Sequence, residues 1–170
     1  LGDADVKALA VDEPFLPLVE HEQIAPFAKT AFAVSAKPLG GKLPDYETLL
    51  KAAAPAAMHE SKEDDDAILL YTGGTTGRSK GVRLTHRNVV SNGMQCAMEM
   101  GFRGTDTYLH IAPMFHSADL LGTGFTLLGG SHAYLPQFTP RNMLTAIQDL
   151  GVTTTMMAPT MIIMTLQELK

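Results

Sequence analysis

A loop rich in glycine and threonine is the part of this sequence best suited to chemistry. It lies within Tyr71–His86, which reads YTGGTTGRSKGVRLTH. Glycine permits the close backbone approach and the positive φ angles that let amide N–H groups surround a phosphate. Threonine hydroxyls can donate to phosphate oxygens or meet a magnesium ion, and lysine adds a mobile positive charge. We therefore expect a polyphosphate site formed by Thr72, Gly73, Gly74, Thr75, Thr76, Gly77 and Lys80.

The spacing of this loop separates it from two common phosphate-binding motifs. In a Walker A loop the lysine directly follows a glycine, whereas here Arg78 and Ser79 stand between Gly77 and Lys80. The dinucleotide fingerprint must open a helix, whereas this loop is followed by GVRL, which is typical of a strand. A plain hairpin turn would explain the glycines, but it has no use for three threonines and a lysine.

Short apolar runs alternate with helical patterns and place the loop at the end of a strand. We expect strands at 67–71, 81–84, 107–112, 132–135 and 152–157, and helices at 86–100, 119–130, 140–150 and 159–170. The first two strands are expected to be antiparallel neighbours that flank the glycine loop. This alternation predicts an α/β fold with a mostly parallel sheet and helices on both faces. In such sheets ligands collect at the carboxyl ends of the strands. Both the glycine loop and the later PMFHSAD segment follow predicted carboxyl ends.

The chain divides into three parts by composition and hydrophobic pattern. Residues 1–35 read as one α/β unit, with strand-like runs at Val6–Val11 and Thr30–Ser35 around a helical stretch. Residues 36–66 read as an irregular connection with a short Ala-rich helix and the acidic SKEDDD, which we expect to be a solvated loop. Residues 67–170 form the predicted subdomain that contains the phosphate loop.

Composition excludes several classes of protein. The net charge is −5 and the basic residues are scattered, so no stripe could follow a nucleic-acid backbone. The single cysteine, Cys96, cannot form an internal disulfide, which favours a reducing, cytoplasmic location. No segment reaches the roughly 18 apolar residues of a transmembrane helix. The chain starts without methionine and stops within a helical pattern, so we expect a piece of a longer protein, of unknown oligomeric state.

The loop and its surroundings resemble the AMP-forming adenylating enzymes, which include acyl-CoA and aryl-CoA synthetases and the adenylation domains of peptide synthetases. Their signature ends in a Pro-Lys-Gly-Val segment with Thr-His a few residues later. This chain has YTGGTTGRSKGV and then LTH, with Ser79 where proline is usual and Gly73 where serine is common. The likeness continues through APMFHSADLLGTGFTLLGG to the end, so it covers residues 67–170 well and implies part of the large N-terminal domain of such an enzyme.

The resemblance also gives a role to His116. By residue type alone, a histidine after a strand is more often structural, but the family's histidine of this Phe-His pair lines the passage between the acyl pocket and the nucleotide. Thr76, Lys80 and His116 are therefore the expected catalytic residues. Met114, Phe115, His116, Gly122 and Gly124 are the expected substrate-pocket residues. His21, His59, His110 and His132 show no spacing typical of a metal site, and we expect them to be structural.

The resemblance implies a reaction in two halves. ATP with Mg²⁺ and a small-molecule carboxylate first form an acyl-adenylate, and coenzyme A, as co-substrate, then displaces AMP. The family's later motifs and its C-terminal domain have no counterpart in these residues, so the chain alone is expected to be inactive. Three alternatives stay open: a free-standing nucleotide-binding or regulatory module, an adenylation domain that loads a carrier protein, and a different phosphotransfer enzyme.

Overall fold

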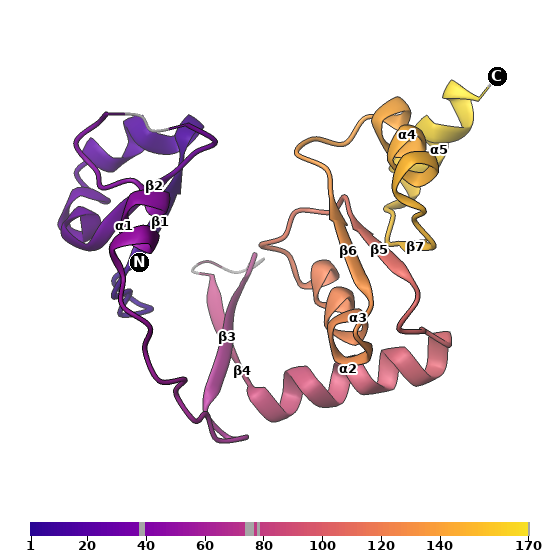
Figure 1. Cartoon of the computed structure of the whole chain (residues 1–170), viewed down its shortest axis with the longest axis horizontal. Helices are drawn as coiled ribbons and strands as arrows, with labels where there is room; N and C mark the ends of the chain where they lie inside the picture. The colour runs from indigo at the N-terminus through magenta and orange to yellow at the C-terminus, as the bar shows by residue number, and fades with distance from the viewer. Residues whose placement is uncertain (38–39, 74–76, 78, 170) are drawn as a thin grey trace. The chain divides into compact units, whose positions relative to one another are not determined.

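The computed structural model describes residues 1–37, 40–73, 77 and 79–169 and consists of two compact units (Figure 1). The first unit spans Leu1–His59 and the second spans Glu60–Lys170. The boundary between them falls within the predicted connection 36–66. Within the described ranges, none of the helices is both long and apolar enough to cross a membrane.

The first unit is a small α/β unit in which the helical stretch between the two strands forms 3₁₀ helices and not an α-helix. Its elements are β1 (Leu9–Asp12), the 3₁₀ helices η1 (Glu13–Glu20) and η2 (Ala25–Thr30), β2 (Ala31–Val34) and α1 (Tyr46–Ala52). Pro14 and Pro17 both fall within η1, and proline lacks the N–H that an α-helix needs in its interior. Strands β1 and β2 are parallel, and Val11, Val19 and Ala31 form the core between them and η1.

The second unit begins with a β-hairpin that carries the glycine loop. Strands β3 (Asp66–Thr72) and β4 (Lys80–Thr85) are antiparallel, and their pairing runs from Asp66 opposite Thr85 to Thr72 opposite Lys80. This confirms the prediction that two neighbouring antiparallel strands flank the loop.

The acidic segment 61–66 is exposed, and three of its carboxylates pair with arginines. Arg87 contacts Glu63 at 2.6 Å and Asp64 at 3.3 Å, and Arg83 contacts Asp66 at 2.6 Å. Exposed pairs of this kind contribute little stability individually, about 0–1 kcal/mol. They nevertheless connect the segment to the strand and helix that follow the loop.

Helix α2 (His86–Met100) has the predicted bounds because both of its ends are specified locally. The Thr85 hydroxyl accepts a hydrogen bond from the Asn88 N–H at 3.2 Å, and the Asn88 side chain accepts one from the Thr85 N–H at 3.0 Å. This reciprocal pair is a capping box. At the other end Gly101 adopts the left-handed conformation, with φ of 69°.

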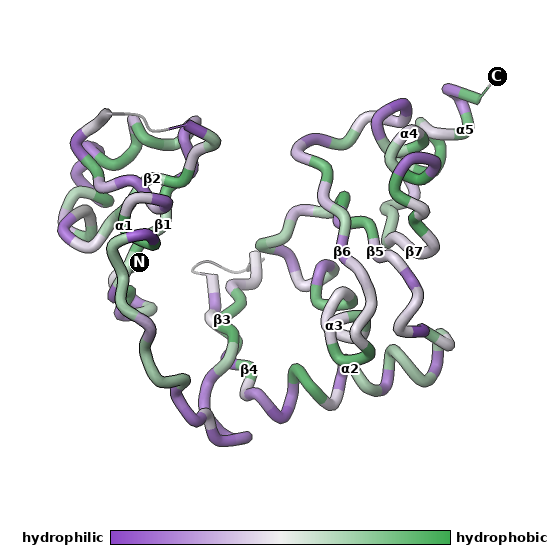
Figure 2. The backbone as a smooth tube through the Cα atoms, viewed as in Figure 1, coloured by the Kyte–Doolittle hydropathy of each residue, from purple (hydrophilic) through white to green (hydrophobic). Residues whose placement is uncertain are grey.

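A three-stranded parallel sheet forms the centre of the second unit. Its strands are β5 (Thr107–His110), β6 (Ser131–Tyr134) and β7 (Thr154–Thr155), in the order β6-β5-β7. The other helices of the second unit are the 3₁₀ helix η3 (Ser117–Leu121), α3 (Gly122–Leu128), α4 (Pro140–Leu150) and α5 (Pro159–Glu168). Hydrophobic and hydrophilic residues both occur along α4, which is typical of a helix with one buried face (Figure 2).

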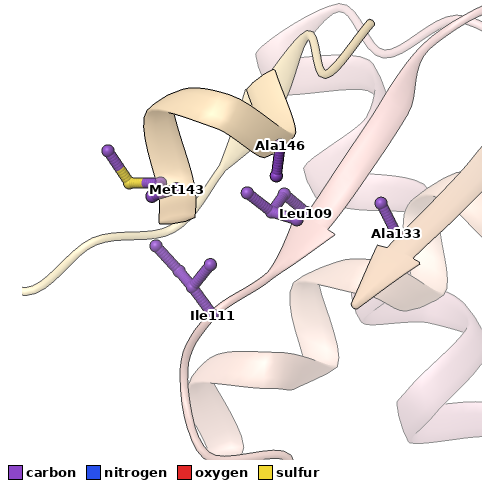
Figure 3. Packing of buried hydrophobic residues seen from close by; sticks show 5 residues of the cluster. All are labelled: Leu109, Ile111, Ala133, Met143 and Ala146. Carbon is purple, nitrogen blue, oxygen red and sulfur yellow. The ribbon is translucent and has the colours of Figure 1, made fainter. Parts of the chain in front are cut away.

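Helices cover both faces of this sheet, as predicted. Leu109 packs with Met143 and Ala146 of α4 (Figure 3). On the opposite face, Tyr108 stacks on Phe125 of α3 with ring centroids 5.0 Å apart. Alternate residues of β5 thus serve the two layers.

The strands of the described residues form three separate sheets, where the sequence suggested one. The pairs β1-β2 and β3-β4 each form a two-stranded sheet, and the third sheet is β6-β5-β7. The predicted strand 152–157 is reduced to Thr154–Thr155. The α/β class with parallel strands is confirmed.

Candidate functional site

The two strand ends that flank the glycine loop are hydrogen-bonded to each other. Thr72 is the last residue of β3, and its hydroxyl donates to the carbonyl of Lys80, the first residue of β4, at 3.4 Å. Gly77 has φ of +134°, a conformation that side chains rarely permit. Of the other predicted binding residues, Gly74, Thr75 and Thr76 lie outside the described residues.

The segment after β5 presents His116 in a defined state. His116 is the N-cap of η3, and its Nδ1 accepts a hydrogen bond from the Ala118 N–H at 3.1 Å. A neutral imidazole has one donor and one acceptor nitrogen, so the proton of the neutral ring lies on Nε2. The His116 N–H also donates to the Pro113 carbonyl at 2.9 Å, which closes the turn after the strand. His116 is exposed and can offer one N–H to a ligand.

The hairpin and this segment line one cleft of about 570 Å³. The carboxyl end of β3 contributes Thr72 and Gly73, and the segment after β5 contributes Phe115 and His116. The full lining is Leu70, Tyr71, Thr72, Gly73, Val82, Leu84, Phe115, His116, Ser117 and Leu120. Most of these side chains are apolar, with a few polar groups among them, as in small-molecule sites. The structure therefore brings together residues that are more than 40 positions apart in the sequence.

Met114 lies in a second, larger cleft at the carboxyl ends of β5 and β6. This cleft has a volume of about 810 Å³ and its lining includes Met114, Gln137 and Met161. Phe115 and Met114 thus border different clefts, although they are consecutive and were predicted to border the same acyl chain.

Gly122 and Gly124 are buried and do not line either cleft. A Cβ at Gly122 would lie 2.8 Å from Cε1 of His110, and one at Gly124 would lie 3.1 Å from the Gly93 carbonyl oxygen. Their small size therefore serves the packing of α3 against β5 and α2. The space that a side chain would occupy at each position is filled by protein atoms.

Sequence reasoning missed a polar network beside the site. His110, Asp119, His132 and Thr126 are connected by hydrogen bonds, whereas we expected only a structural role for both histidines. Burial is the main cause that lowers the pKa of His132, and the neighbouring His110 lowers it further. Burial also raises the pKa of Tyr108, which contacts His110, to about 12. The signal in the sequence was His110, a histidine at the end of a strand pattern that is otherwise mostly apolar.

The fold and the cleft define a class of protein. A glycine-threonine loop with a lysine at the carboxyl end of a strand, in an α/β unit, is the arrangement of a nucleotide-binding domain. The family model "AMP-binding enzyme" matches residues 1–170, and the chain belongs to this family. The predicted resemblance to adenylate-forming enzymes is confirmed.

Relatives of the chain are named CoA ligases. It is 40% identical to the long-chain-fatty-acid–CoA ligase of Bacillus subtilis over 105 residues, which cover 59% of this chain and 19% of that protein. It is 32% identical to the 2-succinylbenzoate–CoA ligase of Bacillus licheniformis over 121 residues, 69% of this chain and 25% of the relative. The chain therefore spans about a fifth to a quarter of these curated relatives.

Solved structures share the fold. The O-succinylbenzoate coenzyme A synthetase MenE of Bacillus subtilis, in complex with ATP and a magnesium ion, matches with a TM-score of 0.77 and 26% identity. The match covers 99% of this chain and 32% of that chain. Both units of the present chain thus have counterparts within one larger protein.

Proposed function

We propose that the full-length protein is an ATP-dependent, AMP-forming carboxylate–CoA ligase that activates a fatty or aryl acid. The observation that carries this proposal is the shared cleft of the glycine-loop hairpin and the Phe115–His116 segment. A phosphate site and a carboxylate site must adjoin in such an enzyme, because a carboxylate oxygen attacks the α-phosphorus of ATP. The P–O bond to the next phosphate then breaks, and pyrophosphate leaves.

The loop residues bind the polyphosphate in this proposal. Backbone N–H groups of Gly73, Gly74 and Gly77 and hydroxyls of Thr72, Thr75 and Thr76 surround the phosphates, and Lys80 adds positive charge. Donors that are fixed before the reaction stabilise developing charge without reorganisation. Within the described residues, no cluster of three or more His, Cys, Asp or Glu could hold a metal ion. We assign Mg²⁺ to the nucleotide phosphates and the loop hydroxyls, because hydroxyl oxygens can meet a magnesium ion.

His116 orients the carboxylate. Its Nδ1 is occupied by the Ala118 N–H, so its Nε2–H is the group that can donate to a carboxylate oxygen. Phe115 and Met114 border the acyl chain from their two clefts. We do not extend the acyl pocket to Gly122 and Gly124, because His110 and Gly93 occupy the space beside them.

The second half of the reaction requires more than this chain. A thiolate of coenzyme A attacks the acyl carbonyl carbon, the C–O bond to AMP breaks, and a thioester forms. We propose that residues outside this chain contribute to both halves, so the isolated chain does not turn over. A cytoplasmic role in fatty acid metabolism fits this activity. A carrier-protein thiol is the alternative acceptor.

Pyrophosphate exchange tests the proposal directly. The intact gene product is incubated with ATP, Mg²⁺ and labelled pyrophosphate, together with a series of fatty or aryl carboxylates. Exchange that depends on a carboxylate, followed by AMP release when CoA is added, is the expected result. ATP binding without exchange for any carboxylate would instead identify a nucleotide-binding module. Exchange with no CoA thioester, but with acylation of a phosphopantetheine protein, would identify a carrier-loading domain.

A further inference from the structure

Four side chains from four elements form a continuous hydrogen-bonded chain. Nδ1 of His110, at the end of β5, lies 2.6 Å from Oδ1 of Asp119 in η3. Nε2 of His110 lies 2.8 Å from Nδ1 of His132 in β6. Nε2 of His132 in turn lies 3.0 Å from the hydroxyl of Thr126 in α3. We refer to Asp119, His110, His132 and Thr126 as the Asp-His-His-Thr network.

The centre of this network is buried and closely packed. His110 is 7% exposed, and the side chain of Asp119 is 10% exposed. The Tyr134 ring stacks on His110 with centroids 4.4 Å apart and an angle of 9°, and the Tyr108 ring meets it edge-on at 4.7 Å. Gly122 leaves the room that the His110 ring occupies. A buried polar group must be hydrogen-bonded to avoid a large desolvation cost, and both nitrogens of His110 are.

Proton accounting shows that one bond of the network keeps its direction. With both rings neutral, Thr126 donates to His132, His132 donates to His110, and His110 donates from Nδ1 to the Asp119 carboxylate. After one proton is added to His110, its Nε2–H donates to His132, and the His132 Nε2–H donates to Thr126. The Thr126 hydroxyl then donates to the Gly122 carbonyl, at 3.4 Å. The His110–Asp119 bond runs in the same direction in both states.

This constant bond holds η3, the helix that His116 caps. Asp119 lies three residues after His116, and its N–H donates to the His116 carbonyl at 3.0 Å. The Asp119 side chain connects that turn to the last residue of β5. His110 and Asp119 therefore fix η3, and with it His116, to the central sheet. Neither residue lines the cleft that contains His116.

We propose that the Asp-His-His-Thr network is a positioning device for His116, in which Asp119 and His110 set the carboxylate-binding geometry from outside the cleft that contains His116. This inference rests on the proposed function, in which His116 orients the carboxylate. The network acts indirectly, by holding His116 in place. A catalytic group must be held close to its productive geometry for proximity to accelerate a reaction.

Kinetics in the intact gene product test the coupling. Asp119→Ala is expected to lower kcat/KM for the carboxylate by about 10-fold to 10²-fold, with the KM for ATP unchanged, since small displacements near the reacting groups have effects of this size. Asp119→Asn keeps an oxygen that accepts from His110 Nδ1 and should restore most of the activity. The double variant Asp119→Ala/His116→Ala should be no slower than His116→Ala alone, because residues that act as a unit are not additive.

The control variant is Thr165→Ala. Thr165 is another buried polar residue, 8% exposed, and its hydroxyl donates to the Met161 carbonyl within α5 at 2.8 Å. Its removal should leave the carboxylate kinetics unchanged. If Asp119→Ala and His116→Ala were fully additive, or if Asp119→Ala lowered only the melting temperature, Asp119 would be structural and the inference would be wrong.

A second measurement does not depend on turnover. In ¹⁵N-histidine-labelled intact protein, the wild-type His116 ring should carry its proton on Nε2, and Asp119→Ala should shift it toward a mixture of tautomers. The His110 Nδ1 proton should persist at pH 6 and at pH 8. Unchanged His116 signals in Asp119→Ala would overturn the inference. A wild type that lacks carboxylate-dependent exchange would instead contradict the proposed function, and the ring signals would still decide the positioning role.

Discussion

Lys80 is the residue whose removal tests the phosphate loop most directly. It is exposed, and it begins β4 opposite Thr72, where the two strands flank the glycine loop. Lys80→Ala should slow adenylate formation in the intact protein by about 10²-fold, the effect of losing one fixed charge-stabilising donor. Folding should be little affected because the side chain is not packed. The measurement is carboxylate-dependent pyrophosphate exchange, with the melting temperature taken in parallel.

The matched control for this prediction is Lys51→Ala. Lys51 is also exposed and lies in the last turn of α1, in the other unit. Exchange at the wild-type rate is expected in this control. Equal rates in Lys80→Ala and Lys51→Ala would remove Lys80 from the site. Thr76→Ala, although Thr76 lies outside the described residues, should resemble Lys80→Ala.

His116 serves as both a helix cap and the proposed carboxylate ligand, and two substitutions separate these roles. His116→Ala should lower kcat/KM for the carboxylate while leaving the KM for ATP unchanged, and its cost in stability should not exceed the roughly 0.5–2 kcal/mol of a lost N-cap. His116→Asn can still accept from the Ala118 N–H, since asparagine is a good N-cap. If His116→Asn restored full activity, capping would be its whole function and the carboxylate assignment would fail.

At the scale of secondary structure, helices α2 and α3 pack closely against each other at glycine positions. The Cβ of a residue at position 124 would lie 3.1 Å from the Gly93 carbonyl oxygen and 3.1 Å from the Phe102 ring. The obstacle is partly backbone and cannot rotate away. Gly124→Val should therefore lower the free energy of unfolding by about 1–3 kcal/mol, the usual cost of overpacking. Urea denaturation of the intact protein measures this.

Gly41→Ala is the comparison for the overpacking prediction. A Cβ at Gly41 would meet nothing within 4 Å, and its φ is not in the left-handed region. Its free energy of unfolding should stay within about 0.5 kcal/mol of wild type. A Gly124→Val variant as stable as Gly41→Ala would show that the two helices can separate without cost.

At the scale of the whole molecule, His132 makes stability depend on pH. Burial is the main cause that holds its pKa below the usual 6.5; His110 lowers it further, and Asp119 opposes both. Between the lowered pKa and 6.5, the unfolded chain binds a proton that the folded chain does not bind. Stability is therefore fully present above about pH 6.5 and is lost as the pH falls through this window.

Urea denaturation at pH 7.5 and pH 5.5 measures this effect. We expect the wild type to lose stability at the lower pH, and we expect His132→Gln to lose less. His59→Gln is the control, since His59 is exposed and should leave the wild-type pH dependence unchanged. The same pH dependence in His132→Gln and wild type would assign the loss to other groups.

Elements whose ends are specified by neighbouring residues could be predicted from the sequence. The bounds of α2 follow from Thr85, Asn88 and Gly101, and those of α4 follow from Thr139, Pro140 and Gly151. Each of these caps acts over three or four residues. The helical stretch of the first unit was less predictable, because prolines converted it to 3₁₀ helices. Strand β7 is short because its bounds depend on pairing with β5.

The sequence by itself determined the α/β class, the antiparallel hairpin around the glycine loop and the family, because these depend on local spacing and on a contiguous motif. The tertiary structure alone decided which residues meet. It placed Phe115 and His116 beside Thr72 and Gly73, and it directed Gly122 and Gly124 into helix packing. It also joined His110, Asp119, Thr126 and His132 into one network. Such contacts join separate elements of the fold, and no spacing along the chain encodes them.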